Sequence, residues 1–244
     1  MFSLFKKELR GFLSSLIGYL VIIVFLLTIG LFLWVFPGTD FNIPENGFAN
    51  MDGLFLLAPW VFMFLIPAVT MKMFSEEKKS GTIELLLTRP ITDFQIIFAK
   101  FLAGLTLVVM ALTPSLIYYL AVHHLASPEG NVDTGAMWGS YIGLLFLAAG
   151  YVAIGLFASC LTDSQIVSFI IALFLCFFLY LGFDSLSSLA LFGKVDMLLQ
   201  QIGMQAHYIS MSRGVLDTRD LVYFLSISGF FLLLTHIKIR SRNW

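Results

Sequence analysis

Charged residues are scarce in this sequence, and their scarcity excludes an ordinary water-soluble fold. Only 12% of the 244 residues are Asp, Glu, Lys or Arg, whereas 59% are hydrophobic. Soluble domains carry about 25% charged residues. A globule of this length has too small an interior to hide so much apolar surface from water. The composition therefore predicts a protein that is solvated by lipid.

Sequence patterns of catalytic and binding sites are also missing. The chain has no Gly-x-x-x-x-Gly-Lys-Ser/Thr phosphate loop, no His-Glu-x-x-His and no Gly-x-Ser-x-Gly. Its net charge of -1 offers no basic footprint for nucleic acid. The two cysteines, Cys160 and Cys176, lie within or at the end of apolar runs and predict neither a disulfide nor a metal pair. We expect no ATPase or other catalytic residue, no cofactor bound by this chain and no nucleic-acid partner.

What the sequence does contain is a series of apolar runs, each long enough to cross a membrane. A helix of about 20 apolar residues spans about 30 Å of hydrocarbon. Six runs qualify, and none of them contains Asp, Glu, Lys or Arg. We expect an all-α, polytopic membrane protein with a single domain over 1–244. Its spans are expected at about 14–36, 53–71, 101–121, 137–161, 166–183 and 221–237.

The distribution of Lys and Arg predicts the orientation. Eleven of these residues fall in the N-terminal segment, the loop between the second and third spans, and the C-terminal tail. Only three fall in the loops on the other side. Because cytoplasmic loops are enriched in Lys and Arg, we expect both termini to lie in the cytoplasm, at a bacterial cytoplasmic (inner) membrane.

Residues 1–13 are expected to form a separate interfacial helix before the first span. Its two faces differ in chemistry, with Phe2, Phe5, Leu9, Phe12 and Leu16 on one and Lys6, Lys7 and Arg10 on the other. A helix with this pattern lies along a leaflet with its apolar face in the lipid and its basic face toward the headgroups.

The loop at 75–100, between the second and third spans, is the most structured polar segment. Lys78–Gly81 is a break signal. Residues 82–88 are then expected to form a short helix that ends at Arg89-Pro90, because proline disfavours helix in the residue before it. The run Leu85–Leu87 is too short to cross the membrane, which indicates docking at the membrane face or on another protein.

Two further helix starts carry capping patterns. Thr92 with Gln95 three residues later predicts a capping box that opens the third membrane helix before the membrane. Asp217–Asp220 is expected to cap the sixth span. The long outer loop at 184–220 is expected to hold one short helix over Val195–Gln205.

Small residues repeat every four positions at the start of the fourth span, at Gly135, Gly139 and Gly143. Glycines at this spacing let helix backbones approach closely. We expect them to serve helix packing.

His123 and His124 are adjacent at an outer membrane edge, with Glu129 and Asp133 nearby in the sequence. Two imidazoles and a carboxylate are possible metal ligands. Adjacent residues of a helix point in different directions, however. The sequence therefore favours two solvated histidines, and no metal site is expected.

The stretch from Glu76 to Thr92, followed by Lys100, resembles the signature of the ABC-2 family of transporter permeases, Glu-x-x-x-Gly-Thr-x-Glu-x-Leu…Pro…Lys. The six runs, the N-terminal helix and the long last outer loop are similar to that family along nearly the whole chain. Ser212–Asp217 also fits the family. Overall, the chain resembles in particular the permease subunit associated with gliding motility in Bacteroidetes.

The resemblance implies a half-transporter that pairs with a second permease half and is driven by a separate ATPase, which binds ATP and Mg²⁺. The 82–88 helix would be the coupling helix, held in a groove of that ATPase, and residues 1–13 would be the elbow helix. The implied coupling residues are Glu76, Glu77, Gly81, Thr82, Glu84, Leu86 and Pro90.

Two other functions stay open from the sequence. One is a structural membrane anchor of an envelope or motility machine. The other is an ion-coupled secondary carrier, which is disfavoured because such carriers tend to place ionisable residues at mid-membrane. The residues indicate neither the substrate nor the direction of transport.

Overall fold

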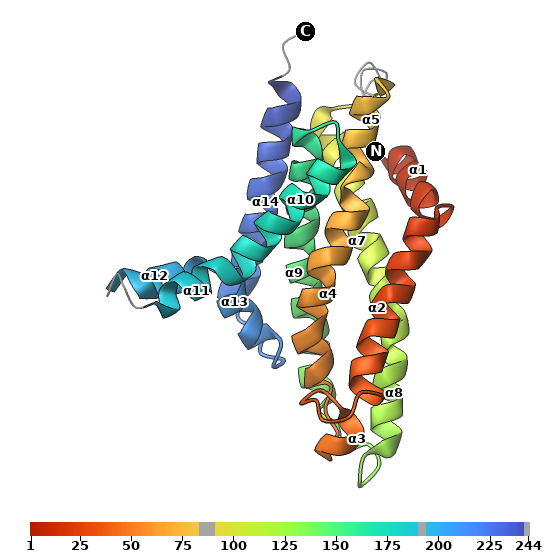
Figure 1. Cartoon of the computed structure of the whole chain (residues 1–244), viewed down its shortest axis with the longest axis vertical. Coiled ribbons are helices and arrows are strands. Elements are labelled where there is room, and N and C mark those ends of the chain that lie inside the picture. The colour runs from red at the N-terminus through yellow and green to blue at the C-terminus, as the bar shows by residue number, and fades with distance from the viewer. Residues whose placement is uncertain (83–90, 190–193, 242–244) are drawn as a thin grey trace.

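The computed structural model describes residues 1–82, 91–189 and 194–241. The described residues contain helices, including one 3₁₀ turn (η1) and one π turn (η2), and no strand. The elements labelled in Figure 1, with η1 and η2, are α1 Phe2–Leu13, α2 Leu16–Trp34, α3 Ile43–Asn46, α4 Asp52–Thr70, α5 Lys72–Lys79, α7 Asp93–Leu112, η1 Thr113–Ser115, α8 Leu116–Leu125, α9 Thr134–Leu161, α10 Gln165–Phe177, η2 Phe178–Gly182, α11 Phe183–Ser188, α12 Lys194–Ile202, α13 Met204–Met211 and α14 Thr218–Arg240.

Six helical stretches are long and apolar enough to cross a membrane. They are Leu16–Trp34, Asp52–Lys79, Asp93–Leu125, Thr134–Leu161, Gln165–Ser188 and Thr218–Arg240. The expected fold class, an all-α polytopic membrane protein with six spans, is confirmed. Two stretches run well past the predicted 53–71 and 101–121, because α5 continues α4 and because α7 begins eight residues before the third apolar run.

The fourth membrane helix, α9, forms the centre of the bundle. It packs against α4, α5, α7, α10, α13 and α14. Its span is 72% buried inside the protein, whereas the spans of α2 and α10 are only 28% and 22% buried. Much of the apolar surface of α2 and α10 is therefore left uncovered by the rest of this chain.

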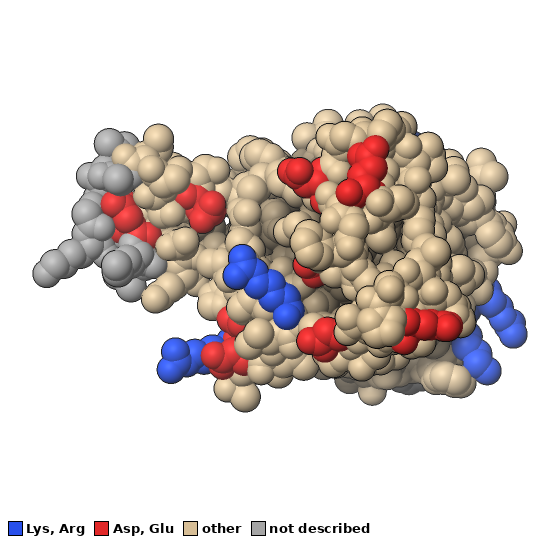
Figure 2. Space-filling view, turned by 90° about the horizontal axis from the view of Figure 1, so that it is seen from below, with Lys and Arg blue, Asp and Glu red and all other residues tan. Residues whose placement is uncertain are grey.

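The two ends of the bundle differ in the charge that they expose. Both termini lie at the end that holds α1 and α5 (Figure 1), which we call the α5 end. The opposite end, which we call the α3 end, holds α3 and the loop after α8. Figure 2, a view onto the α3 end, shows more acidic than basic side chains there. Exposed acidic residues in these loops are Asp40, Glu45, Asp52, Glu129 and Asp133.

The predicted helix caps are present. Thr92 accepts a hydrogen bond from the Gln95 backbone, and the Gln95 side chain accepts one from the Thr92 backbone, so the capping box before α7 is confirmed. Asp217 accepts from the backbone N–H of Arg219 at the start of α14. The break after α5 is confirmed as well, since α5 ends at Lys79 and Gly81 has a φ of +69°.

In the described part of the predicted outer loop at 184–220, two helices follow the end of α11, where a single one was expected over Val195–Gln205. The structure has α12 and α13, which are separated at Gly203, where ψ is 138° and the backbone is extended. The fifth span bends as well, because the π turn η2 separates α10 from α11. Figure 1 shows α11 and α12 projecting away from the main bundle, whereas α10 packs against α4 and α9.

Two of the three glycines in the α9 repeat lie where a neighbouring segment leaves no room for a side chain. A Cβ added to Gly139 would overlap the backbone carbonyl of Gly214, and one added to Gly143 would lie 2.6 Å from Met211 Cβ. Gly135 has only the Asp133 side chain within reach, at 3.4 Å. Close packing of α9 against the segment that links α13 to α14 therefore depends on Gly139 and Gly143.

Candidate functional site

The first helix turns one row of side chains toward the bundle. Leu4 and Phe12 are buried, and Glu8, which lies between them at four-residue spacing, is mostly buried. Phe2, by contrast, is 66% exposed. The bundle-facing row of α1 therefore includes a carboxylate, and the sequence did not predict this row.

That carboxylate meets a completely buried lysine of α7. Lys100 is 0% exposed, and its Nζ lies 3.0 Å from Glu8 Oε1 and 3.0 Å from Glu77 Oε1. The same Nζ donates to the Met73 carbonyl at 2.7 Å and lies 5.0 Å from the centre of the Phe74 ring. One ammonium group thus joins α1, α5 and α7 at the α5 end. We call Glu8, Glu77 and Lys100 the charge cluster.

A second cation lies beside the charge cluster in a more exposed position. Lys7 Nζ lies 3.6 Å from Glu77 Oε1 and 3.9 Å from Glu8 Oε1, and its side chain is 66% exposed. With Lys7 included, two cations face two carboxylates, so the local charge is balanced. Within the described parts of the chain, the buried Glu77 Oε2 has no hydrogen-bond partner.

The junction between α4 and α5 is held by a side chain of α9. Ser159 Oγ accepts from the backbone N–H groups of Phe74, at 2.8 Å, and Ser75, at 3.1 Å. It donates to the Met71 carbonyl at 3.0 Å. A hydroxyl inserted into the helical hydrogen-bond ladder is a known cause of helix bends. Ser159 therefore ties α9 to the point where α5 continues α4.

A cleft of about 400 Å³ opens beside the charge cluster, between α1 and α5. Its lining includes residues of both helices and the start of the next segment: Lys7, Glu8, Gly11, Phe12, Lys72, Met73, Glu76, Glu77, Ser80 and Thr82. Three predicted coupling residues, Glu76, Glu77 and Thr82, and four residues of the predicted elbow helix therefore lie around one depression.

The predicted coupling residues divide into two groups. Glu76, Gly81 and Thr82 are exposed at the end of α5, and the Thr82 hydroxyl lies 2.8 Å from that of Ser80. Glu77 instead points into the bundle toward Lys100. Residues 83–90, which hold Glu84, Leu86, Pro90 and most of the predicted 82–88 coupling helix, lie outside the described residues. Their contacts with an ATPase stay a prediction.

Sequence reasoning missed Glu8 and Ser159, and it treated Lys100 only as part of a motif. The spacing of Leu4, Glu8 and Phe12 was the available signal, because residues four apart share one helix face. A glutamate in that row has to find a cation once the helix packs. Nothing in the sequence indicated Ser159, since its partners lie more than 80 residues away.

The family comparison covers nearly the whole chain. Residues 2–237 match the family described as ABC-2 family transporter protein. No curated protein matches the chain. The matched range includes all six membrane helices up to residue 237 and the whole charge cluster. Proteins of this family are the non-catalytic membrane-spanning subunits of ABC transporters. The chain therefore belongs to the ABC-2 transporter family and is a multi-pass membrane protein.

Proposed function

We propose that this chain is the permease subunit of an ABC transporter, and that a separate ATPase drives it by docking at the α5 end. The observation that carries the proposal is the salt-bridged Lys100, which ties α1, α5 and α7 together there. Residues 83–90 connect α5 to α7. Any protein that displaces this connection acts directly on two helices that one buried ion pair holds together.

The charge cluster provides a mechanical reason for these helices to move as a unit. Removing one partner from a buried ion pair costs about 3–5 kcal/mol. Tilting α5 away from α7 would likewise leave Lys100 or Glu77 without its charged partner. The helices therefore keep their contact, and displacement at the α5 end is passed along α7 into the membrane. Ser159 keeps the junction of α4 and α5 attached to α9.

The distribution of charge supports a cytoplasmic location for the α5 end. Both termini and α5 carry most of the described Lys and Arg residues, and the loops of the α3 end expose acidic groups (Figure 2). The positive-inside rule assigns such a basic end to the cytoplasm. We infer a bacterial inner-membrane protein with both termini inside, where ATP is available to the partner subunit.

The exposed apolar surfaces of α2 and α10 support a second permease half. Leu27, Ile170 and Phe174 are among their large exposed side chains. Lipid covers part of this surface, and we propose that a second permease, identical or related, covers another part. The second permease completes the transporter together with two ATPase subunits.

We also propose that the transporter serves gliding motility, on the strength of the resemblance described above. Deletion of the gene in a gliding bacterium that encodes this chain is expected to abolish colony spreading. Complementation with the intact chain restores it. Normal spreading of the deletion strain would refute the motility role and leave the transporter assignment intact.

Purification of the full chain from native membranes in mild detergent tests the transporter proposal. We expect an ATPase subunit to co-purify and to hydrolyse ATP, and we expect proteoliposomes of the complex to couple hydrolysis to permease motion. Lys100→Met is expected to leave binding of the ATPase subunit in place but to reduce the coupling of ATP hydrolysis to permease motion. A folded chain from which no nucleotide-binding polypeptide can be recovered would contradict the proposal.

Lys7→Met is the matched control for this experiment. Lys7 contacts the same glutamates, but it is largely exposed, so its removal is expected to leave coupling nearly unchanged. Equal losses in both variants would show that general charge at the α5 end matters, and not the buried ion pair.

A further inference from the structure

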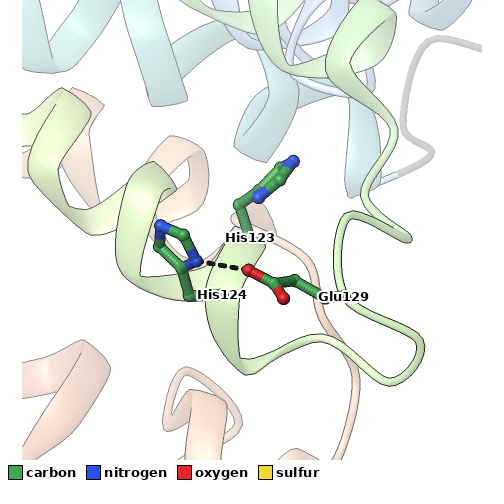
Figure 3. A group of neighbouring side chains, drawn as sticks. All are labelled: His123, His124 and Glu129. Atoms are coloured by element: carbon green, nitrogen blue, oxygen red, sulfur yellow. Dashed lines mark hydrogen bonds and ion pairs between the residues drawn. The ribbon is translucent and has the colours of Figure 1, made fainter.

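Two histidines and a glutamate converge at the α3 end, far from the charge cluster. His123 and His124 lie in the last turn of α8, and Glu129 lies in the loop that follows (Figure 3). One ligand atom from each of the three lies within 4.8 Å of the other two. His124 Nδ1 and Glu129 Oε1 are 2.5 Å apart, as the dashed line in Figure 3 marks.

The folding of the loop removes the sequence-based objection that adjacent histidines diverge. Gly130 adopts a φ of +84°, and its N–H donates to the His123 carbonyl at 3.1 Å, which turns the chain back over the helix end. This turn brings Glu129 onto His124. The two imidazole rings lie edge to face, with centres 5.7 Å apart, so their nitrogens reach a common region.

Two neighbours hold His123 in place. Its ring packs against the Tyr119 ring, with centres 6.0 Å apart, and a Cβ at Gly130 would lie 3.3 Å from His123 Nε2. Any residue larger than glycine at position 130 would therefore crowd the imidazole as well as strain the backbone. His124 and Glu129 have side chains that are 69% and 64% exposed, so they can rotate by small amounts to adjust to a ligand.

We propose that His123, His124 and Glu129 bind one divalent transition-metal ion, with Zn²⁺ as the best match. Imidazole nitrogens and a carboxylate are preferred zinc ligands, at about 2.0–2.2 Å from the metal. Tetrahedral geometry then places ligand atoms about 3.3 Å apart. The observed separations, 2.5 Å for one pair and at most 4.8 Å for the others, bracket that value. Water supplies the fourth ligand at this exposed position.

The choice of metal follows from the nitrogen ligands. Mg²⁺ and Ca²⁺ prefer oxygen ligands, whereas imidazole suits Zn²⁺, Cu²⁺ and Ni²⁺. A bound ion would link the end of α8 to the loop that leads to α9. That loop also lines a cleft of about 720 Å³. Val122 of α8, Asn131 of the loop and Phe48 are among the residues that line this cleft. Metal binding would thus stiffen one side of this cleft.

Isothermal titration of the full chain in detergent, purified with an affinity tag that contains no histidine, tests the site. ZnCl₂ is expected to bind with one ion per chain, and excess Mg²⁺ is not expected to compete. His124→Ala and Glu129→Gln are each expected to weaken binding by at least about tenfold, since even a change in the groups around a metal ligand costs about 10–100-fold.

Two control variants identify the site. His236→Ala, at the α5 end, and His207→Ala, whose Nδ1 pairs with Asp220 at 2.7 Å, are expected to bind Zn²⁺ as the unaltered chain does. Co²⁺ in place of Zn²⁺ is expected to show the visible absorption of a tetrahedral site, and Glu129→Gln to change it. Absence of stoichiometric binding, or loss of binding in His207→Ala but not in His124→Ala, would overturn the proposal.

Discussion

A fully buried lysine is stable in this protein because two carboxylates and a backbone carbonyl surround its charge. The ammonium group of Lys100 has three donors. Glu8 Oε1 and the Met73 carbonyl accept hydrogen bonds from it, at 3.0 and 2.7 Å, and Glu77 Oε1 forms an ion pair with it at 3.0 Å. Burial of a charge without such partners would cost several kcal/mol. The same arrangement makes the cluster sensitive to the loss of any one member.

Replacement of Lys100 tests this sensitivity. Lys100→Met keeps most of the side-chain volume but leaves two carboxylates facing each other, so it is expected to lower the free energy of unfolding by about 3–5 kcal/mol. Lys7→Met removes an exposed lysine that lies beside the charge cluster, and it is expected to lower the free energy of unfolding by less than about 1 kcal/mol. Denaturation of the purified chain in detergent measures both, and similar values for the two variants would contradict the buried-cluster argument.

The glycines of α9 give a second test at single positions. Gly139→Ala places a methyl group on the backbone of Gly214 and is expected to destabilise the protein by about 1–3 kcal/mol through overpacking. Gly135→Ala, one helical turn earlier, meets only the Asp133 side chain at an ordinary contact distance of 3.4 Å and is expected to be neutral or slightly stabilising. Thermal unfolding in detergent compares the two. Equal midpoints would show that α9 does not depend on a close approach at Gly139.

At the scale of the elements, the position of α5 depends strongly on its contacts with other helices. It continues α4, but the hydrogen bonds at the junction go to Ser159 of α9. The ion pair between Glu77 and Lys100 also holds α5 against α7. The Lys78–Asp163 ion pair, at 3.7 Å, and the buried side chains of Met73 and Phe74 hold α5 as well, so its position depends on contacts with several neighbouring elements.

Removal of the hydroxyl at Ser159 tests the anchoring of α5. Ser159→Ala leaves the N–H groups of Phe74 and Ser75 without their acceptor, and each buried unsatisfied group costs about 1–3 kcal/mol. Ser168→Ala is the control, because the buried Ser168 Oγ has no hydrogen-bond partner within the described ranges. We expect a lower unfolding midpoint only for Ser159→Ala. Hydrogen exchange localised to α5 should rise in that variant and stay constant in the control.

The whole molecule separates its charges between two ends, and that separation makes the orientation testable. Single cysteines are placed at Lys79 and Asp40, which are both exposed and lie in α5 and in the loop before α3. Lys79→Cys is expected to react with a membrane-impermeant maleimide only after the cells are permeabilised. Asp40→Cys is expected to react in intact cells. Cys160 and Cys176 are buried, so their background labelling is low. The reverse pattern would invert the topology and remove the ATPase from the α5 end.

The sequence alone determined the membrane class, the six helical spans and the caps of α7 and α14. These features depend on composition, on runs of apolar residues and on contacts within four residues. Such local patterns need no knowledge of the fold, because lipid requires every spanning segment to satisfy its own backbone hydrogen bonds. The family signature around Gly81 and Thr82 was readable for the same reason.

Tertiary structure alone decided where Glu8, Glu77, Lys100 and Ser159 meet. Glu8 and Lys100 are 92 residues apart, and Ser159 acts on backbone groups 84 and 85 residues earlier in the chain. No periodicity connects positions so distant, so a polar residue on a helix is assigned to the solvent until packing brings it a partner. The same holds for Glu129, which only the turn at Gly130 brings onto His124. Local sequence therefore set the helices and their environment, while long-range packing chose which polar groups became buried and paired.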